Sequence, residues 1–168
     1  MDFALVVNIL TAVTLITGFF FAAFEWRRTR LESRRQSQVL LIRSFDSPEF
    51  VKAMRLIVAL PDGLGRQEVE SALGSDGIDL SWYFAGIMES LGFLVFNREV
   101  DIRYVDQTLG GPVTITWRKL RVYADQVRQE LGRDTMYEWF QWLAERLEEL
   151  ERDEGRTAAY EREREWKP

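Results

Sequence analysis

The chain has 168 residues, a formal net charge of −5 and neither cysteine nor histidine. Without cysteine it can form no disulfide, thiolate nucleophile or cysteine-ligated metal site, and without histidine it lacks the commonest general base and metal ligand. The acidic balance also disfavours a nucleic-acid partner, because binding phosphates requires a basic face.

The N-terminal stretch 3–24 contains 22 consecutive uncharged residues, and Asp2 and Glu25 flank it. A helix of this length is about 33 Å long, enough to cross a hydrocarbon core of about 30 Å. A cleaved signal peptide is the alternative, but no basic residue precedes the run, and the bulky Phe24 stands where a small residue is needed. We therefore predict a transmembrane anchor over residues 1–25, with the span at 3–24.

Basic residues follow the predicted span directly. Residues 25–45 contain six arginines and two glutamates, a net charge of +4, whereas the rest of the chain from Asp46 carries 16 basic and 24 acidic residues, a net charge of −8. Basic residues close to a span are retained in the cytoplasm, so we expect the N-terminus outside and the body inside. The residues expected to contact anionic lipid headgroups are Trp26, Arg27, Arg28, Arg30, Arg34 and Arg35.

The predicted span carries small residues at every fourth position, which places them on one face of the helix. In lipid, such a face allows two helix backbones to approach closely. Small residues are also common in spans that do not associate, and this alternative stays open. The residues predicted to form a helix–helix contact within the membrane are Thr14, Gly18 and Ala22.

Several helices are predicted after the span. Residues 26–45 contain no glycine or proline, so we expect a basic juxtamembrane helix. Ser47, Pro48 and Glu49 then predict a helix start, because a serine cap, a proline at the first position and an acidic residue in the first turn all favour one. A short helix over 66–73 should lead into a flexible turn at residues 74–77.

Residues 80–96 form the most apolar segment of the body. Apolar side chains cover nearly all sides of this predicted helix, as is typical of a central buried helix, although a ligand cleft is an alternative interpretation. We expect nearly full burial of Trp82, Phe84, Ile87 and Leu91, and close helix packing at Gly86 and Gly92.

Two further helix patterns follow. Asp101 predicts the cap of a short helix over 102–109, which Gly110, Gly111 and Pro112 should end. Apolar residues of the next helix are spaced 4, 3, 4, 3 and 4 residues apart, at Val113, Trp117, Leu120, Ala124, Val127 and Leu131. The last helix, capped by Asp134 or Thr135, should bury Met136, Phe140, Leu143, Leu147 and Leu150.

These stretches together resemble a known kind of protein family. The helix start at Ser47, the aromatic segment 82–96, the turn at residues 100–102, and the Trp117 helix followed by residues 137–140 resemble a domain-of-unknown-function family of short bacterial membrane proteins. The resemblance covers about residues 40–145. It implies one N-terminal span and a helical cytoplasmic body at the inner membrane, and it implies no activity.

The remaining charged residues give little sign of chemistry. Glu145, Glu148 and Glu149 alternate with arginines, as is typical of a solvated helix face. Arg118, Lys119, Arg121 and Arg128 could bind a phosphate or an acidic partner, but the nearby Asp125 favours ordinary surface pairing. We therefore predict no enzyme, no cofactor and no metal site.

The predicted fold is all-α, with a single N-terminal transmembrane helix followed by a cytoplasmic bundle of about five to six helices over residues 46–150 and a charged tail over 151–168. The leading hypothesis is a membrane-tethered, self-associating interaction or scaffold module at the cytoplasmic face of a bacterial membrane. Its expected partners are the lipid bilayer, anionic headgroups, and a second copy or another membrane protein. The alternative is a membrane effector in a stress or anti-phage response that acts through assembled spans.

Overall fold

The fold is known from a computed structural model, which describes residues 17–19, 21–22, 25, 45, 47–155 and 158–167. The chain divides into two units, residues 1–40 and 41–168. In the first unit, all the described residues are helical and exposed to solvent. The other residues of the predicted span, and the predicted juxtamembrane helix except Phe45, lie outside the described residues.

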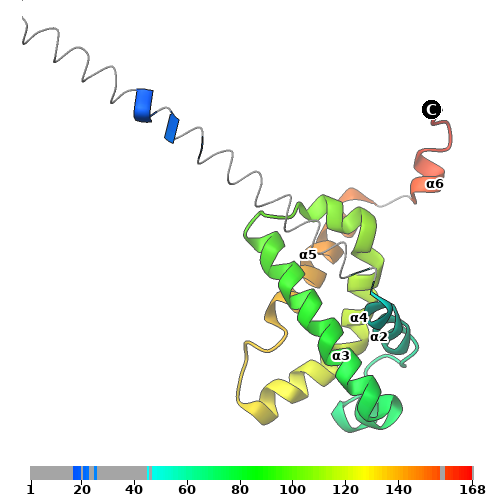
Figure 1. Cartoon of the computed structure of the whole chain (residues 1–168). Helices are drawn as coiled ribbons and strands as arrows, with labels where there is room; N and C mark the ends of the chain where they lie inside the picture. The colour runs from blue at the N-terminus through cyan, green and yellow to red at the C-terminus, as the bar shows by residue number, and fades with distance from the viewer. Residues whose placement is uncertain are drawn as a thin grey trace, which may run out of the picture. The chain divides into compact units, whose positions relative to one another are not determined.

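The second unit is all-helical in its described part (Figure 1). Its five helices are α2 (Pro48–Val58), α3 (Arg66–Phe96), α4 (Ile102–Leu131), α5 (Glu138–Glu154) and α6 (Ala159–Arg162). Helix α3 packs against α2, α4 and α5, and α4 packs against α2 and α5, so these four helices share one core. The predicted all-α fold is confirmed for this part of the chain, and α3 is its central element.

Helix α2 begins as the sequence predicts. The Ser47 hydroxyl accepts a hydrogen bond from the Phe50 amide at 3.2 Å, Pro48 occupies the first turn, and Glu49 lies near the positive end of the helix. The buried Phe50 ring stacks on Phe84 of α3, with ring centroids 5.0 Å apart. This contact joins α2 to the central helix.

The predicted break before the central helix is shorter than expected. Only Gly74 leaves the helical conformation, with φ 65° and ψ 179°, and residues 75–77 are helical. Glycine adopts a positive φ without steric cost, so one residue is enough to redirect the chain. Helix α3 therefore continues on both sides of a local kink, and the four-residue turn prediction was wrong.

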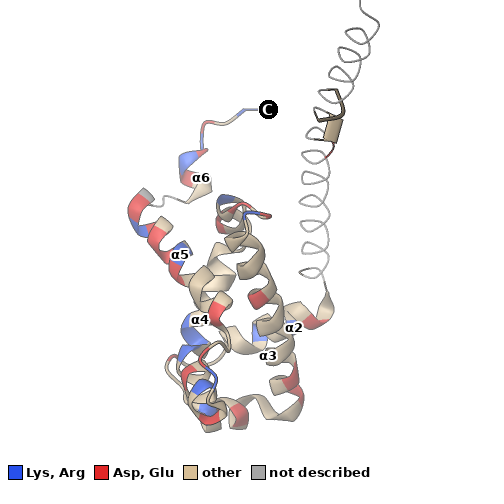
Figure 2. Cartoon of the chain, turned by 90° about the vertical axis from the view of Figure 1, so that its left-hand side faces the viewer, with Lys and Arg blue, Asp and Glu red and all other residues tan. Residues whose placement is uncertain are grey.

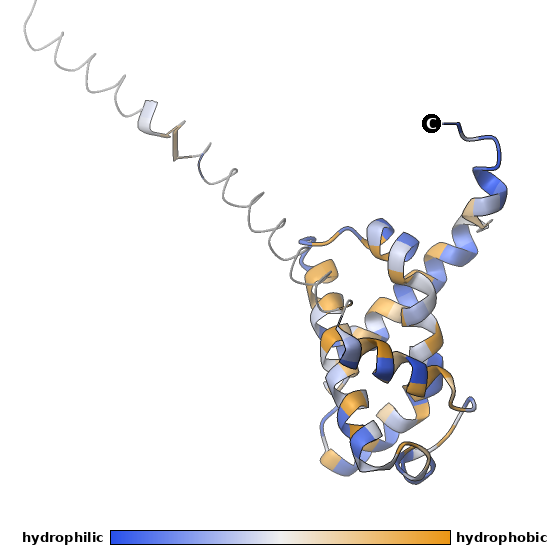
Figure 3. Ribbon diagram, turned by 45° about the vertical axis from the view of Figure 1, so that its right-hand side comes forward, coloured by the Kyte–Doolittle hydropathy of each residue, from blue (hydrophilic) through white to orange (hydrophobic). Residues whose placement is uncertain are grey.

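Burial of α3 is confined to one side, which corrects part of the prediction. Phe84 and Leu91 are buried, but Ile87 is only partly buried and Trp82 is 39% exposed. The neighbouring helices cover one face of α3, so an apolar residue on the other face remains at the surface. Figure 3 shows hydrophobic residues along the helices and a hydrophilic C-terminal tail.

Helix α3 is also the one helix in the described part of the chain that is long and apolar enough to cross a membrane. Core helices of soluble domains meet the same criterion, and α3 contributes Phe84, Met88 and Leu91 to the core. This property is therefore only weak evidence for a membrane protein. Most of the predicted N-terminal span lies outside the described residues, so this comparison of helices does not include it.

Helix α4 runs through Pro112, although the sequence predicted two separate helices. A side chain on the residue before proline normally clashes with the proline ring in a helix, and Gly111 has no side chain to clash. Val105 and Val113 are buried on either side of Pro112, so both halves of α4 are attached to the same core. The predicted stripe on α4 is buried from Val113 to Val127, but Leu131 is 57% exposed.

Helix α5 begins later than predicted. Its first residue is Glu138, and the preceding Tyr137 has a left-handed conformation with φ 58°, so neither Asp134 nor Thr135 is the cap. Of the expected core residues of α5, Phe140, Leu143 and Leu147 are buried, whereas Leu150 is partly exposed.

A very close contact between two helices lies where α3 meets α5. A Cβ atom built on Gly92 would lie 2.2 Å from the carbonyl oxygen of Trp139, so no other residue fits there without a backbone shift. Gly86 has open space instead, since a Cβ there would meet nothing within 4 Å. The prediction of close packing is confirmed at Gly92 and was wrong at Gly86.

Replacing Gly92 with alanine should therefore destabilise the body, because overpacking of this kind typically costs about 1–3 kcal/mol. Gly86→Ala on the same helix is the matched control, since alanine is favoured over glycine in a helix interior by about 1 kcal/mol. Thermal unfolding of the full-length protein in mild detergent, followed by tryptophan fluorescence, should give a lower Tm for Gly92→Ala only. Equal Tm values for the two variants would contradict the close contact.

Candidate functional site

A cluster of four aromatic rings lies at the surface, where α3 and α5 meet. We call it the aromatic face; it consists of Phe93, Phe96, Trp139 and Trp142. Its ring centroids are 4.7 Å apart for Phe96 and Trp139, 5.6 Å for Phe93 and Trp139, and 5.7 Å for Phe96 and Trp142. Phe93 is 49% exposed and Phe96 is 53% exposed, while the two tryptophans are partly buried. Contiguous exposed apolar surface of this kind marks interaction sites more often than isolated apolar residues do.

Two residues of α3 position the α5 part of the aromatic face. Gly92 lets the backbone of Trp139 approach closely, and one turn earlier the Glu89 carboxylate accepts hydrogen bonds from the amides of Trp139 and Phe140, both at 3.2 Å. The first amides of a helix have no partner within it, so Glu89 replaces the missing side-chain cap of α5. The positive end of the α5 dipole also favours this carboxylate.

The same carboxylate is half-buried, and this has an electrostatic cost. Burial raises the pKa of Glu89 above its usual value, and the nearby Glu138 adds to the rise. The amides of Phe140 and Trp139 and the charge of Arg128 act in the opposite direction. Because burial dominates, the folded body binds a proton at Glu89 more readily than the unfolded chain does.

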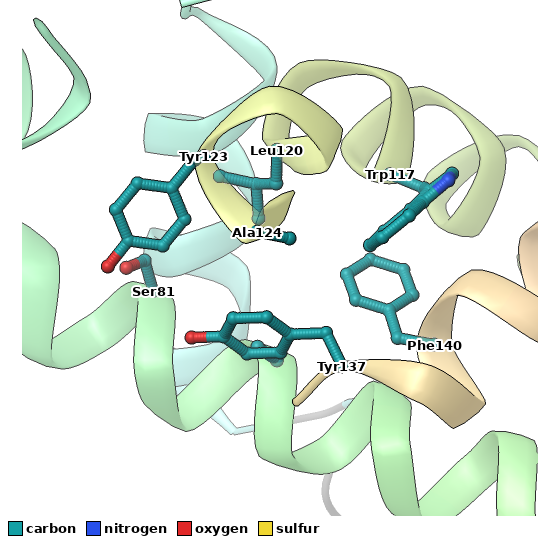
Figure 4. Close-up of a pocket in the computed structure, with 8 residues that line it drawn as sticks. Ser81, Trp117, Leu120, Tyr123, Ala124, Tyr137 and Phe140 are labelled. Atoms are coloured by element: carbon teal, nitrogen blue, oxygen red, sulfur yellow. The ribbon is translucent and has the colours of Figure 1, made fainter. Parts of the chain in front are cut away.

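A small cavity lies between α3, α4 and the start of α5 (Figure 4). The hydroxyl-bearing residues in its wall are Ser81, Tyr123 and Tyr137, and Figure 4 shows their hydroxyl groups on one side of it. Its volume is about 10 Å³, which suits a single water molecule and not a metabolite. Burial raises the pKa of both tyrosines, so their hydroxyls lose the proton only at a higher pH than an exposed tyrosine does.

Three of the four basic residues in the predicted strip on α4 pair with acidic residues, as the sequence indicated. The Asp62 carboxylate lies 2.5 Å from the Lys119 amine and 3.5 Å from Arg118, and its hydrogen bond to Lys119 lowers the pKa of Asp62. Arg128 pairs with Asp125 at 3.0 Å. On α5, acidic and basic residues alternate toward the C-terminal end (Figure 2), and the described residues contain no cluster of three potential metal ligands.

The structure describes only part of the sequence-predicted membrane site. Gly18 and Ala22 are helical and exposed, and a Cβ on Gly18 would meet nothing within 4 Å. The other predicted residues, Thr14, Trp26, Arg27, Arg28, Arg30, Arg34 and Arg35, lie outside the described residues.

Sequence reasoning missed the aromatic face, because it assigned the α3 aromatics to a buried hub and placed Trp139 and Trp142 beside a core stripe. The sequence did contain one sign of an exposed aromatic face: aromatic residues lie on every side of the predicted helix over residues 80–96. A helix packed on one side only cannot bury all of them.

The fold and surface define a class of protein: a helical domain with one central helix and an exposed aromatic face. Within that class, the chain belongs to the family described as "Domain of unknown function (DUF4760)", whose model matches residues 12–147. The expectation of an uncharacterised domain family is thereby confirmed. Comparisons with curated proteins and with solved structures gave no match.

Because the pKa of Glu89 is raised, we predict that its contribution to the stability of the body depends on pH. The stabilising contribution of Glu89 is complete at acidic pH, and it is lost as the pH rises from the ordinary carboxyl range through the raised pKa. Urea unfolding of the wild type and of Glu89→Gln should be compared between about pH 4 and pH 8. We expect the free energy of unfolding of the wild type, minus that of the variant, to fall with pH. A difference that grows with pH would show that the amide hydrogen bonds outweigh burial.

Proposed function

We propose that this protein is a membrane-tethered module that associates with a second copy of itself through the aromatic face. The observation that carries the proposal is the set of four mutually contacting rings at the surface of α3 and α5. Aromatic residues are enriched in protein interfaces and supply a large share of their binding energy. The role of the module is interaction rather than catalysis.

The composition of the aromatic face favours a second copy as the partner. A two-fold contact places the same patch on both partners, so the patch must be complementary to itself. Aromatic rings meet this condition because they form edge-to-face pairs with one another. Charges of both signs adjoin the face in sequence, with Arg98 after Phe96 and Glu138 before Trp139. Two copies can therefore place opposite charges against each other at the rim.

The membrane anchor strengthens such a contact. Exposed, helical Phe19 and Phe21 belong to the uncharged run 3–24, and their exposure suits a lipid environment. An anchor restricts all copies to one plane and raises their effective concentration, so even a weak contact between bodies becomes populated. In this proposal the N-terminus lies outside a bacterial inner membrane, the arginines after the span contact anionic headgroups, and the body is cytoplasmic.

Removing the exposed rings tests the proposed contact. The double variant Phe93→Gln/Phe96→Gln should lower energy transfer several-fold between donor- and acceptor-labelled full-length protein in lipid vesicles, because it removes the centre of the interface. Leu131→Gln is the control, since Leu131 has a similar exposure at the far end of α4. If the double variant leaves energy transfer unchanged, the aromatic face is not the surface through which two copies associate.

The small-residue face of the span makes a separate prediction. Gly18→Ile should weaken association of a span reporter that carries residues 1–30, because a large side chain separates the two backbones. Ile16→Leu should leave the signal unchanged. Equal signals from the native span and from Gly18→Ile would leave self-association to the body alone.

The alternative function, a membrane effector, makes a different prediction. Growth arrest on expression that depends on the span would favour this alternative over the interaction module.

A further inference from the structure

One side of helix α2 faces away from the core and combines exposed apolar and basic residues. The other side of α2 buries Phe50, Ala53 and Ile57. At about 100° per residue, four exposed residues fall within one arc of about 120° that lies opposite these three. We call this arc the α2 face; it consists of Val51, Lys52, Arg55 and Val58.

The apolar part of the α2 face is a pair of valines. Val51 and Val58 are each 42% exposed, and their positions along the chain place them one above the other, about two helical turns apart. A single exposed valine is ordinary on a protein surface. These two flank Arg55 along the helix, so the face presents apolar and cationic groups together.

The charged part of the α2 face is cationic and unpaired. None of the ion pairs in the described part of the chain includes Lys52 or Arg55. Glu49 is the one acidic residue of α2, and it lies outside the arc, about 60° beyond Lys52. The face therefore carries two positive charges, although residues 46–168 contain 16 basic and 24 acidic residues, a net charge of −8.

This combination suits a lipid surface better than a protein partner. Protein interfaces are depleted in lysine, and valine is rare among the residues that dominate their binding energy. At an anionic membrane, apolar side chains enter the headgroup region, while lysine and arginine extend their stems and place their charges at the lipid phosphates. Each basic residue close to such a surface is attracted to it. The α2 face therefore fits an anionic bilayer.

The position of α2 in the chain brings this face within reach of a membrane. Arg35, the last residue expected to contact headgroups, precedes Pro48 by thirteen residues, and a chain of that length spans at most about 45 Å. Such a tether raises the effective concentration of the face at the surface, so even a contact made by two charges and two valines becomes populated. The acidic remainder of the body is repelled by anionic lipid, which favours the orientation with the α2 face toward the membrane.

We infer that the α2 face lies on the anionic surface of the membrane, with the charges of Lys52 and Arg55 at lipid phosphates and with Val51 and Val58 among the headgroups. The inference rests on the membrane tethering in the proposed function, but it does not require self-association. Among the described helices, α2 packs only against α3 and α4, whereas the tryptophans of the aromatic face belong to α5. The two surfaces share no residue, so one body can lie on lipid and bind a second copy at the same time.

Fluorescence quenching in vesicles tests this contact, because the chain has no cysteine and accepts a single labelled one. Ala59 is exposed, directly follows α2 and lies on the side of the α2 face, whereas Glu148 is exposed on α5. Full-length Ala59→Cys and Glu148→Cys are each labelled with bimane. They are reconstituted into vesicles of phosphatidylcholine and phosphatidylglycerol that contain a lipid with a nitroxide on its headgroup. We expect several-fold stronger quenching at position 59 than at position 148.

Charge variants identify the side chains responsible. In labelled Ala59→Cys protein, Lys52→Gln/Arg55→Gln should lower the quenching to the level at position 148, and glutamine keeps a helix propensity close to that of both residues. Arg152→Gln/Arg164→Gln, which removes two exposed cations from α5 and the tail, is the matched control and should leave the quenching unchanged. Vesicles of phosphatidylcholine alone should have the same effect as the α2 variant. So should about 1 M salt, which shortens the screening length to about 3 Å.

Equal quenching at positions 59 and 148, or quenching at 59 that survives Lys52→Gln/Arg55→Gln, would overturn the inference. If the α2 variant instead lowered energy transfer between two copies and left the quenching unchanged, the α2 face would be a protein contact. Flotation of the vesicles separates these outcomes from a failure of the proposed function. Protein that floats with the vesicles keeps its tether whatever the quenching shows, whereas protein that does not float would overturn both proposals.

Discussion

The contact between Gly92 of α3 and the backbone of Trp139 is the constraint on which the arrangement of this body depends. It lets α5 approach α3 so closely that the Glu89 carboxylate reaches the first amides of α5. On the inner side of the contact, Phe140 packs against Phe84 and against Trp117. On the outer side, the same geometry assembles the aromatic face. One close approach thus fixes both the core and the surface that we assign to self-association.

Helix α5 depends on this contact because it supplies no side-chain cap of its own. Most of the stability of a helix in a folded protein comes from tertiary packing rather than from its own propensity, so α5 depends on its packing and on the Glu89 hydrogen bonds. The half-buried carboxylate is costly to ionise, and this cost is partly offset by the amides it satisfies. Loss of the contact would therefore release α5 and disperse the aromatic face at the same time.

Local features of the fold followed from the sequence, whereas features set by tertiary packing did not. Ser47 and Asp101 cap the helices they were expected to cap, because capping depends on a few neighbouring residues. The continuation of α4 through Pro112 requires a shared core on both sides of the proline, which no local pattern reveals. The hub residues Phe84 and Leu91 were identified correctly, but the exposure of Trp82 depends on which side of α3 lacks a neighbour. For the same reason the aromatic face could not be predicted, while the membrane residues remain predictions from the sequence.

The absence of cysteine from the chain allows a direct measurement of the central claim, that two copies meet through the aromatic face. A single cysteine at Gly86 would lie on the exposed side of α3 about two turns before Phe93, whereas one at Glu148 would lie on the side of α5 opposite Trp139. The two variants should be treated with a short bis-maleimide in native membranes. The account predicts a strong cross-linked dimer for Gly86→Cys and a weak one for Glu148→Cys. Equal cross-linking, or stronger cross-linking at position 148, would contradict it.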